Sequence, residues 1–326
     1  MTIPVNYAGV NVIAFPANSL ARRDLHGHSI CLVIMSVPLI LNPAARSMRA
    51  GMLESRIRTL TPAPELHMTV APGDAQRLAF ELAGEGHRLI VVAGGDGSVN
   101  EAVQGLVQHN LTVSDPANHA ALGILPVGTM NVFAHELGLP KSVEKCWERI
   151  HERRLRTIDL WKANEQYFIQ LAGVGLDAEI VKQTSWKLKK QLGPLSYAVT
   201  AARVLGQQQP ALTVHIEGRP ALHGSIVLVG NGRHYGGPVP VFSNARNDDG
   251  LLDIIIFHGQ GPLEVFQFLS AIAVTGYEQC GDLDYLQARE FRVECSQESP
   301  YELDGEFAGH VPVHFNPAPF KMLVAC

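Results

Sequence analysis

The sequence predicts a parallel α/β domain followed by an antiparallel β-sandwich domain. Between residues 37 and 137, short apolar segments alternate with helical ones, which is the element order of a parallel sheet covered by helices. After Pro140, many short strand-like segments are separated by glycine-rich turns, a pattern typical of a sandwich. A chain of 326 residues is also long for a single hydrophobic core, so two domains are expected.

The domain boundaries follow from where these patterns begin. Residues 1–34 show no clear period, and Met35 begins the segment MSVPLILNPAARS, which reads as the start of a domain. We therefore assign residues 1–34 to a loosely ordered, dispensable extension. Residues 35–140 are assigned to the α/β domain, and residues 141–326 to the sandwich with its inserted helices.

The first domain is expected to repeat a strand followed by a helix four times. The segment 89–93 is a continuous apolar run rich in Val and Ile, so this strand should be buried on both faces. Strands are expected at 37–41, 66–70, 89–93 and 121–125. Helices are expected at 50–59, 75–83, 98–108 and 132–137.

The second domain is expected to begin with a linker helix and to continue mainly as short strands. The linker helix is predicted at 147–154. Strands are expected at 156–161, 167–171, 211–216, 224–229, 252–257, 290–294, 311–314 and 321–325. Further helices are expected at 178–191, 195–205 and 263–274.

The turn Gly94–Gly97 connects the third strand to the third helix. Glycine allows a ligand to approach the backbone closely, and N–H groups at a helix start attract anions. Ser98 is the expected N-cap, with Glu101 completing a capping box. Asp96 would repel a phosphate unless a divalent cation lay between them. The turn is therefore either a phosphate site with such a cation or an ordinary junction; the P-loop motif is absent.

Polar residues follow each of the four predicted strands. Ligands of parallel sheets bind at the carboxyl ends of the strands. Asn42, Thr69, Asp96 and Thr129 all lie at such ends, so we expect them to converge on one site. In the second glycine turn, Gly128-Thr129-x-Asn131, a hydroxyl and an amide are available for phosphate or ribose, or for capping a helix.

Two acidic turns in the second domain are candidates for chemistry. The turn Arg246–Leu251 contains Asp-Gly, a strong hairpin signal, and its carboxylates and carbonyls would also suit a cation. Glu306 ends the segment LDGE, and glutamate is not a favoured hairpin residue. A carboxylate returned to the cleft from the second domain would suit a general base.

Composition excludes several classes of protein. The net charge of −5 argues against nucleic acid as the main partner. No apolar run reaches the ~18 residues of a spanning helix. The five cysteines are scattered, which argues against metal or disulfide frameworks and fits a reducing cytosol.

A group of basic and aromatic residues suits either a solvated face or a membrane–water interface. These residues are Lys182, Trp186, Lys187, Lys189, Lys190 and Tyr197.

Seven segments of the chain, taken in order, resemble one family. They are LILNPAARS, TVAPGDA, VAGGDGSVNEAVQGL, LGILPVGTMNVFAHELGLP, AGVGLDAEIV, GGPVPVFSNARNDDGLLDIIIF and ELDGEFAG. Each alone is weak, but all seven at this spacing are very specific. Over residues 37–325 the chain resembles the bacterial diacylglycerol kinase-like lipid kinases, which are related to sphingosine kinases.

The resemblance implies a nucleotide-binding α/β domain, a lipid-binding sandwich and an active site in the cleft between them. ATP would donate its γ-phosphoryl group to a lipid hydroxyl, with Glu306 as general base and Asp96 binding Mg²⁺ through water. A structural Mg²⁺ would be bound by Asp249 with the carbonyls of Arg246 and Leu251. Strand ends, glycine turns and the resemblance together give the residues expected to bind the nucleotide. They are Asn42, Thr69, Gly94, Gly95, Asp96, Gly97, Ser98, Val99, Asn100, Gly128, Thr129 and Asn131.

The chain departs from the family at three positions. Val132 stands where members often have Asp, His135 stands where many have Arg, and Ser98 replaces the more usual Thr. The missing carboxylate at Val132 bears on the choice of diacylglycerol as acceptor more than on kinase activity, because Asp96 and Glu306 are both present.

These observations favour an ATP- and Mg²⁺-dependent lipid kinase, cytoplasmic and peripheral at the inner membrane face. Its expected partner is a lipid substrate at a membrane surface, with no nucleic acid, and a homodimer is left open. A soluble NAD kinase-like enzyme, which would share the GGDG turn, is the alternative enzyme. A non-catalytic lipid or nucleotide sensor is the alternative from another class. The LDGE, GTxN and NDDG turns favour the lipid kinase.

Overall fold

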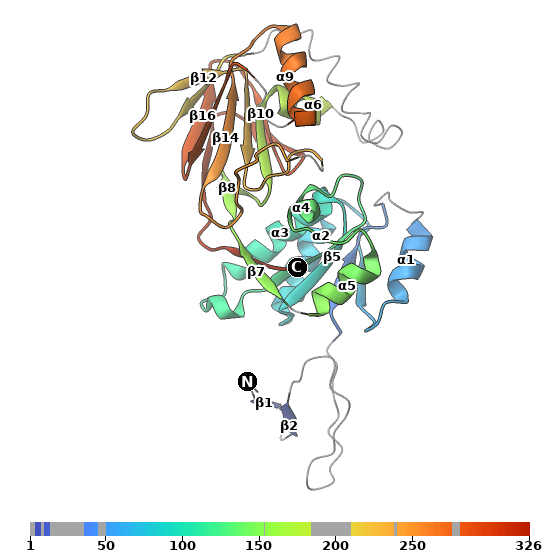
Figure 1. The fold of residues 1–326 in the computed structure, drawn as a ribbon. Coiled ribbons are helices and arrows are strands. Elements are labelled where there is room, and N and C mark those ends of the chain that lie inside the picture. Colours follow the sequence, from blue (N-terminus) through green and yellow to red (C-terminus); the bar gives the residue numbers. More distant parts are fainter. Residues whose placement is uncertain are drawn as a thin grey trace.

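The computed structural model contains two domains, which the chain connects by two crossings (Figure 1). The structure describes residues 4–7, 10–13, 36–44, 50–152, 154–183, 210–237, 240–275 and 281–326. Within these ranges, the strands form three six-stranded sheets and one two-stranded sheet. The two-stranded sheet pairs β1 (Pro4–Tyr7) with β2 (Val10–Ile13). The loose order expected of residues 1–34 stays a prediction, because most of that segment lies outside the described ranges.

The first domain contains a mostly parallel sheet, as predicted. In sheet order, its strands are β4 (Glu65–Met68), β3 (Pro38–Leu41), β5 (Leu89–Gly94), β6 (Ala121–Pro126), β20 (Met322–Ala325) and β7 (Leu155–Ile158). Neighbouring strands are parallel except for β7, which runs antiparallel to β20 at the edge. Residues 90–93 of β5 are fully buried, so the prediction of a strand covered on both faces is confirmed.

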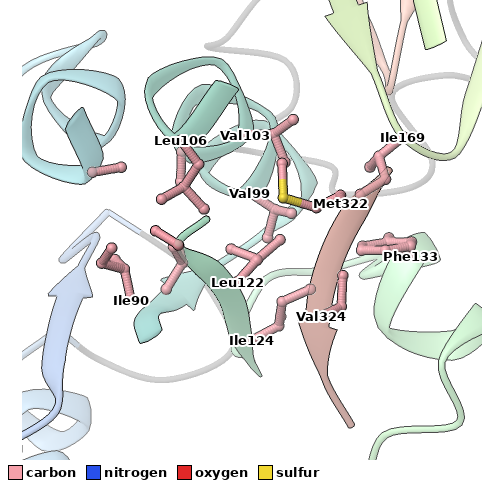
Figure 2. Packing of buried hydrophobic residues seen from close by; sticks show 14 of the residues in the cluster. Ile90, Val99, Val103, Leu106, Leu122, Ile124, Phe133, Ile169, Met322 and Val324 are labelled. Carbon is pink, nitrogen blue, oxygen red and sulfur yellow. The ribbon is translucent and has the colours of Figure 1, made fainter. Parts of the chain in front are cut away.

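Helices cover both faces of this sheet. They are α1 (Ala50–Arg58), α2 (Asp74–Gly84), α3 (Asp96–Asn110), α4 (Val132–Glu136) and α5 (Val143–His151). Residues of α2, α3 and α4 form one hydrophobic cluster with the sheet, and residues of α1 and α5 form another on the opposite face. Figure 2 shows Val99, Val103 and Leu106 of α3 packed over Leu122 and Ile124 of β6.

Three elements that we expected after residue 140, in the second domain, belong to the first. The helix α5 and the strand β7 correspond to the predicted segments 147–154 and 156–161, and β20 corresponds to 321–325. The reason is that β20 pairs in parallel with β6 and is apolar on both sides. Met322 and Val324 join the cluster under α3, and Ala325 joins the opposite cluster. The C-terminus therefore lies in the first domain (Figure 1).

The second domain is the predicted antiparallel sandwich. In sheet order, one sheet contains β15 (Leu283–Ala288), β14 (Leu252–Phe257), β13 (Ile226–Gly230), β10 (Leu171–Gly175), β17 (Pro300–Leu303) and β18 (Glu306–His310). The other contains β12 (Leu222–Gly224), β11 (Leu212–His215), β16 (Phe291–Cys295), β19 (Val313–Pro317), β8 (Trp161–Ala163) and β9 (Gln166–Phe168). One hydrophobic cluster fills the space between the sheets. The sequence did not predict β15 and β17, because both segments mix polar and apolar residues without a clear strand pattern.

In the part of the second domain that the structure describes, two helices cover the outer face of the first of these sheets. They are α6 (Leu176–Gln183) and α9 (Pro262–Thr275), and a cluster of apolar side chains packs them against β13 and β14. The rest of the predicted helix 178–191, and all of 195–205, lie outside the described residues. None of the helices in the described ranges combines the length and apolar character that a bilayer crossing requires.

Candidate active site

The two glycine turns of the first domain lie backbone to backbone. Val127 N–H donates to Gly94 O at 3.2 Å. A Cβ added to Gly128 would lie 2.3 Å from Gly95 Cα, and one added to Gly94 would lie 2.5 Å from Ser98 Cβ. No side chain fits in either place without displacing the backbone or the helix. Gly128 is therefore required to bring the two turns together, and Gly94 leaves room for the first turn of α3.

The N-terminus of α3 has no side-chain cap. The predicted capping box is wrong: the N-cap is Gly95, which makes no side-chain cap bond, and Ser98 is already the third helical residue. The Ser98 hydroxyl accepts a hydrogen bond from Asn42 Nδ2 at 2.8 Å, and the Glu101 carboxylate accepts one from Ala75 N–H at 3.2 Å. The first three N–H groups of the helix consequently have no acceptor within it.

The side chains at the strand ends have different surroundings, and the convergence of all four on one site stays a prediction. Asn42 follows β3 and contacts Ser98, so it lies beside the glycine turn. Thr69 follows β4, is buried, and donates its N–H to Leu41 O at 3.0 Å. Val99 contributes a core side chain, and its N–H donates to Gly95 O at 3.1 Å, so neither group faces a ligand.

The second glycine turn is closed by its own asparagine. Asn131 adopts a left-handed conformation, with φ of 50°. Its Oδ1 accepts from Gly128 N–H at 3.0 Å, and its Nδ2 donates to Gly128 O at 2.9 Å. The amide that the sequence suggested for phosphate or ribose is thus engaged within the turn, whereas the neighbouring Thr129 is exposed.

Asp96 is the first residue of α3 and faces the N-terminus of α4. Its Oδ1 accepts a hydrogen bond from Phe133 N–H at 3.4 Å. Burial raises the pKa of Asp96 to about 6; the backbone N–H groups of α4 oppose this rise, and the nearby carboxyl of Asp304 adds to it. Asp96 is therefore a partly buried carboxylate that lacks a sufficient positive charge beside it.

Asp304 ties the hairpin β17–β18 to both domains. Its carboxylate accepts N–H donors from Ile169, Gln170 and Leu171 at 2.9–3.1 Å. It also accepts from Asn100 Nδ2 at 2.9 Å, across 204 residues of sequence. Asn100 thus connects α3 to this hairpin, and its expected contact with a nucleotide stays a prediction. The turn itself was predicted from sequence, but no local signal pointed to these contacts of Asp304.

Glu306 lies beside the glycine turn of the other domain. It is the first residue of β18, directly after the turn that Asp304 holds. A Cβ added to Gly97 would lie 3.1 Å from Glu306 Oε1, so the absence of a side chain at Gly97 leaves room for this carboxylate. The structure thus brings Glu306 of the sandwich to the N-terminal turn of α3, close in space to Asp96.

A second contact between the domains lies on α4. Glu136 Oε2 accepts from His234 Nδ1 at 2.8 Å and from His234 N–H at 3.0 Å. The Gln170 amide donates to His234 O at 2.9 Å. No sequence pattern marked Glu136, His234 or Gln170 as functional residues. Together they hold α4, and with it the N–H groups facing Asp96, against the sandwich.

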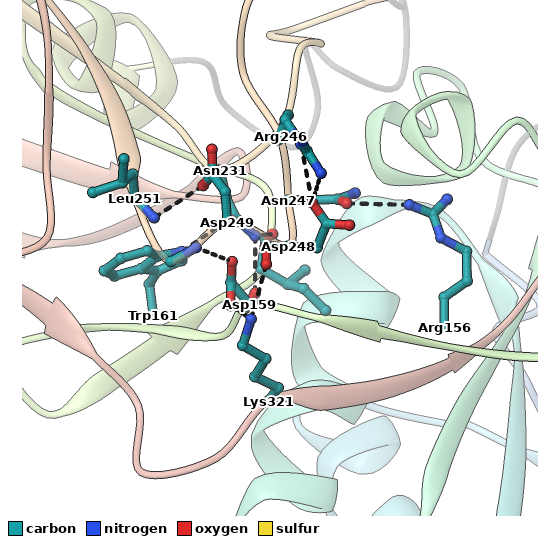
Figure 3. A network of polar contacts seen from close by, with 12 residues as sticks. Arg156, Asp159, Trp161, Asn231, Arg246, Asn247, Asp248, Asp249, Leu251 and Lys321 are labelled. Carbon is teal, nitrogen blue, oxygen red and sulfur yellow. Dashed lines mark hydrogen bonds and ion pairs between the residues drawn. The ribbon is translucent and has the colours of Figure 1, made fainter.

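The predicted structural metal turn lies at the domain crossing (Figure 3). Asp249 is exposed, and its Oδ1 accepts from Leu251 N–H at 3.0 Å. Lys321 Nζ lies 2.6 Å from Asp159 Oδ1 and donates to Asp248 O at 2.9 Å. An ammonium group therefore already supplies positive charge next to the turn. Arg246 directs its side chain to Asp248 at 3.4 Å. Binding of a cation by Asp249 with the carbonyls of Arg246 and Leu251 stays a prediction.

The basic and aromatic group is described only at its first residue. Lys182 Nζ lies 3.1 Å from His310 Nε2 and 5.5 Å from the centre of the Phe307 ring. The other members lie outside the described residues, so their expected role at a membrane stays a prediction. They are Trp186, Lys187, Lys189, Lys190 and Tyr197.

Known proteins resemble both domains. The family model of the diacylglycerol kinase catalytic domain matches residues 36–163, and that of the YegS C-terminal NAD kinase beta sandwich-like domain matches residues 171–326. A diacylglycerol kinase of Bacillus subtilis is 32% identical over 76% of this chain and 81% of its own length. A probable YegS-like lipid kinase of Chromohalobacter salexigens is 32% identical over 75% and 78%.

A solved structure supports the same relationship. The crystal structure of a Bacillus anthracis protein, provisionally described as a diacylglycerol kinase, superposes with a TM-score of 0.73 at 26% identity. The superposition covers 89% of this chain and 96% of that one. Because both domains and their order match, the chain belongs to the diacylglycerol kinase-like family, and it is a lipid kinase.

Proposed function

We propose that this lipid kinase transfers the γ-phosphoryl group of ATP to the hydroxyl of a membrane lipid, with Glu306 as the general base. The observation that carries the proposal is the position of Glu306 Oε1 against Gly97, at the uncapped N-terminus of α3. That helix end attracts phosphate. A base supplied by one domain therefore lies beside a phosphate-binding element of the other, as phosphoryl transfer to an alcohol requires.

The nucleotide would lie along the two glycine turns. The N–H groups of the first turn of α3 are available to phosphate oxygens. Gly94, Gly95 and Gly128 allow close approach, and Thr129 is exposed beside them. Asn42 supports this arrangement through its bond to Ser98. The triphosphate would thus face the side of the cleft where Glu306 lies.

Asp96 fits a role in binding Mg²⁺. Its pKa is raised chiefly because it is buried, so a nearby cation would stabilise its charged form. Among the described residues, no group of three or more His, Cys, Asp or Glu side chains could hold a metal ion alone. Asp96 would therefore share the ion with phosphate oxygens, as is usual for Mg²⁺. The bound ion would supply neutralisation of the phosphate charge that develops during transfer.

In the transfer step, Glu306 would take the proton from the lipid hydroxyl while that oxygen bonds to the γ-phosphorus. The bond from the γ-phosphorus to the bridging oxygen of ADP would break at the same time. Asp304 and Asn100 would keep the Glu306 turn in register with α3. Val132, which stands where members of the family often have Asp, is buried and offers no polar side chain to an acceptor.

The test is a phosphorylation assay with labelled ATP over a panel of lipids in mixed micelles, together with NAD. We expect at least one lipid to be labelled, and Glu306→Gln to lower kcat by about 10²–10⁴-fold with nearly unchanged ATP affinity. Glu217→Gln, an exposed position elsewhere in the sandwich, is the matched control and should retain activity. Efficient labelling of NAD, with no response to lipid or to Glu306→Gln, would overturn the proposal.

A further inference from the structure

Three polar side chains meet behind the turn that carries Glu306. The hydroxyl of Tyr235 lies 2.7 Å from Asp177 Oδ2, 3.1 Å from Glu302 Oε1 and 3.3 Å from the carbonyl oxygen of Ala172. A Cβ on Gly173 would lie 2.5 Å from Asp177 Oδ2 and 2.6 Å from Tyr235 Oη. The glycine in the middle of β10 therefore leaves the space in which this cluster fits.

The number of protons in the cluster is set by its geometry. A tyrosine hydroxyl has one hydrogen and can donate it to one acceptor only. Here it is surrounded by two carboxyl oxygens and a carbonyl. If both carboxylates were ionised, at least one of them would face the hydroxyl oxygen of Tyr235 with no hydrogen between the two oxygen atoms. One carboxyl group must therefore be protonated and donate to Tyr235 Oη.

The surroundings of the two carboxyl groups indicate which one is neutral. Glu302 is fully buried in β17, whereas Asp177 is partly buried in the first turn of α6, where the helix dipole favours negative charge. Burial raises the pKa of Asp177 too, although the hydrogen bond from Tyr235 opposes that rise. Burial, and then the charge of Asp177, raise the pKa of Glu302 further, to well above its ordinary value. Neutral Glu302 would donate to Tyr235, and Tyr235 would donate to ionised Asp177.

The other oxygen of Glu302 bonds to the turn between β17 and β18, which precedes Glu306. Glu302 Oε2 accepts from Gly305 N–H at 2.7 Å. Gly305 and Asp304 both have left-handed backbones, with φ of 85° and 49°, so this tight turn depends on such side-chain support. Glu306 follows immediately, paired with Leu303 across the hairpin. A change at Tyr235 is thus transmitted through one side chain to the backbone next to Glu306.

We propose that Glu302 is a positioning residue that acts in its protonated form, and that the chain Glu302–Tyr235–Asp177 fixes the turn presenting Glu306 to the cleft. The effect of Glu302 on turnover depends on the proposed role of Glu306. The protonation state of Glu302 does not depend on that role, so the positioning role and the protonation state can be tested separately. In this arrangement the neutral acid does what an amide can also do: it accepts one N–H and donates one hydrogen.

The first measurement is the infrared carbonyl stretch of protonated carboxylic acids in the intact protein at pH 8. We expect a band that disappears in Glu302→Gln and persists in Tyr285→Phe. Tyr285 is the matched control because it bonds another buried carboxyl, that of Asp253, in the same sheet away from the turn. A parent spectrum with no band lost in Glu302→Gln would overturn the proposal.

The second measurement is steady-state kinetics on the lipid that the panel identifies. Glu302→Gln should stay within a few-fold of the parent, whereas Glu302→Ala and Tyr235→Phe should lower kcat by about 10²-fold with unchanged KM for ATP. Tyr285→Phe should leave kcat unchanged. Loss of activity in Glu302→Gln equal to that in Glu302→Ala would refute the neutral form. An inactive parent would refute the proposed function alone, since the infrared band would still decide the protonation of Glu302.

Discussion

Asp96→Asn should stabilise the protein while it removes activity. The pKa of Asp96 rises from 3.8 to about 6 on folding, chiefly through burial. Between these values the folded state binds more protons than the unfolded state, so the stability of the parent falls as the pH rises through this window. Asparagine has no proton to lose, so it acquires no buried charge, and it still offers an oxygen to Phe133 N–H. The stability of the variant should therefore not fall as the pH rises through this window.

The size of the effect follows from the shift. Raising the pKa of Asp96 by about two units costs the parent about 3 kcal/mol of unfolding free energy above pH 6, at about 1.4 kcal/mol per pKa unit. The weaker hydrogen bonds of a neutral amide reduce this, so we expect a gain of roughly 1–3 kcal/mol at pH 8 and about half of it at pH 5. For a domain of this size, each kcal/mol raises the melting temperature by about 2–4 °C.

The assay is thermal melting of parent and variant from pH 5 to pH 8, without nucleotide or divalent cation, beside a turnover assay at pH 8. Turnover should fall by about 10²–10³-fold, as for removal of one electrostatic group in an active site. Glu85→Gln, an exposed change at the end of α2, should show no pH-dependent gain. A variant that gains equally at every pH, or that retains turnover, would refute this reasoning.

Two further changes test a turn of the first domain and a turn at the domain crossing. Gly128→Ala would place a Cβ 2.3 Å from Gly95 Cα, so we expect a loss of about 1–3 kcal/mol in unfolding free energy and lower turnover. Gly84→Ala, where nothing lies within 4 Å, should be tolerated in the same melting assay. Asp249→Ala removes the acceptor of Leu251 N–H and should cost about 1 kcal/mol of stability and lower activity indirectly. Equal stabilisation of parent and Asp249→Ala by Mg²⁺ alone would show that Asp249 binds no metal.

The sequence alone determined the elements whose signals are local. The Val- and Ile-rich run at 89–93 forms a strand buried on both faces, since these residue types indicate such a strand wherever it lies in the sheet. The Gly94–Gly97 segment connects this strand to a helix, and the glycines are required there. Glu306 was identified because a glutamate at a tight turn is unusual. The family followed from seven ordered segments and was confirmed by the comparisons.

Only the tertiary structure decided how these parts are used. The segment 321–325 reads as one more sandwich strand, but it completes the parallel sheet, because β6 offers it a free edge and both of its faces are apolar. Ser98 looks like a cap by spacing, yet it lies inside the helix and contacts Asn42. The contacts of Asn100 with Asp304, and of Glu306 with Gly97, join residues about two hundred positions apart. No local pattern encodes such contacts, because they depend on how the two domains pack against each other.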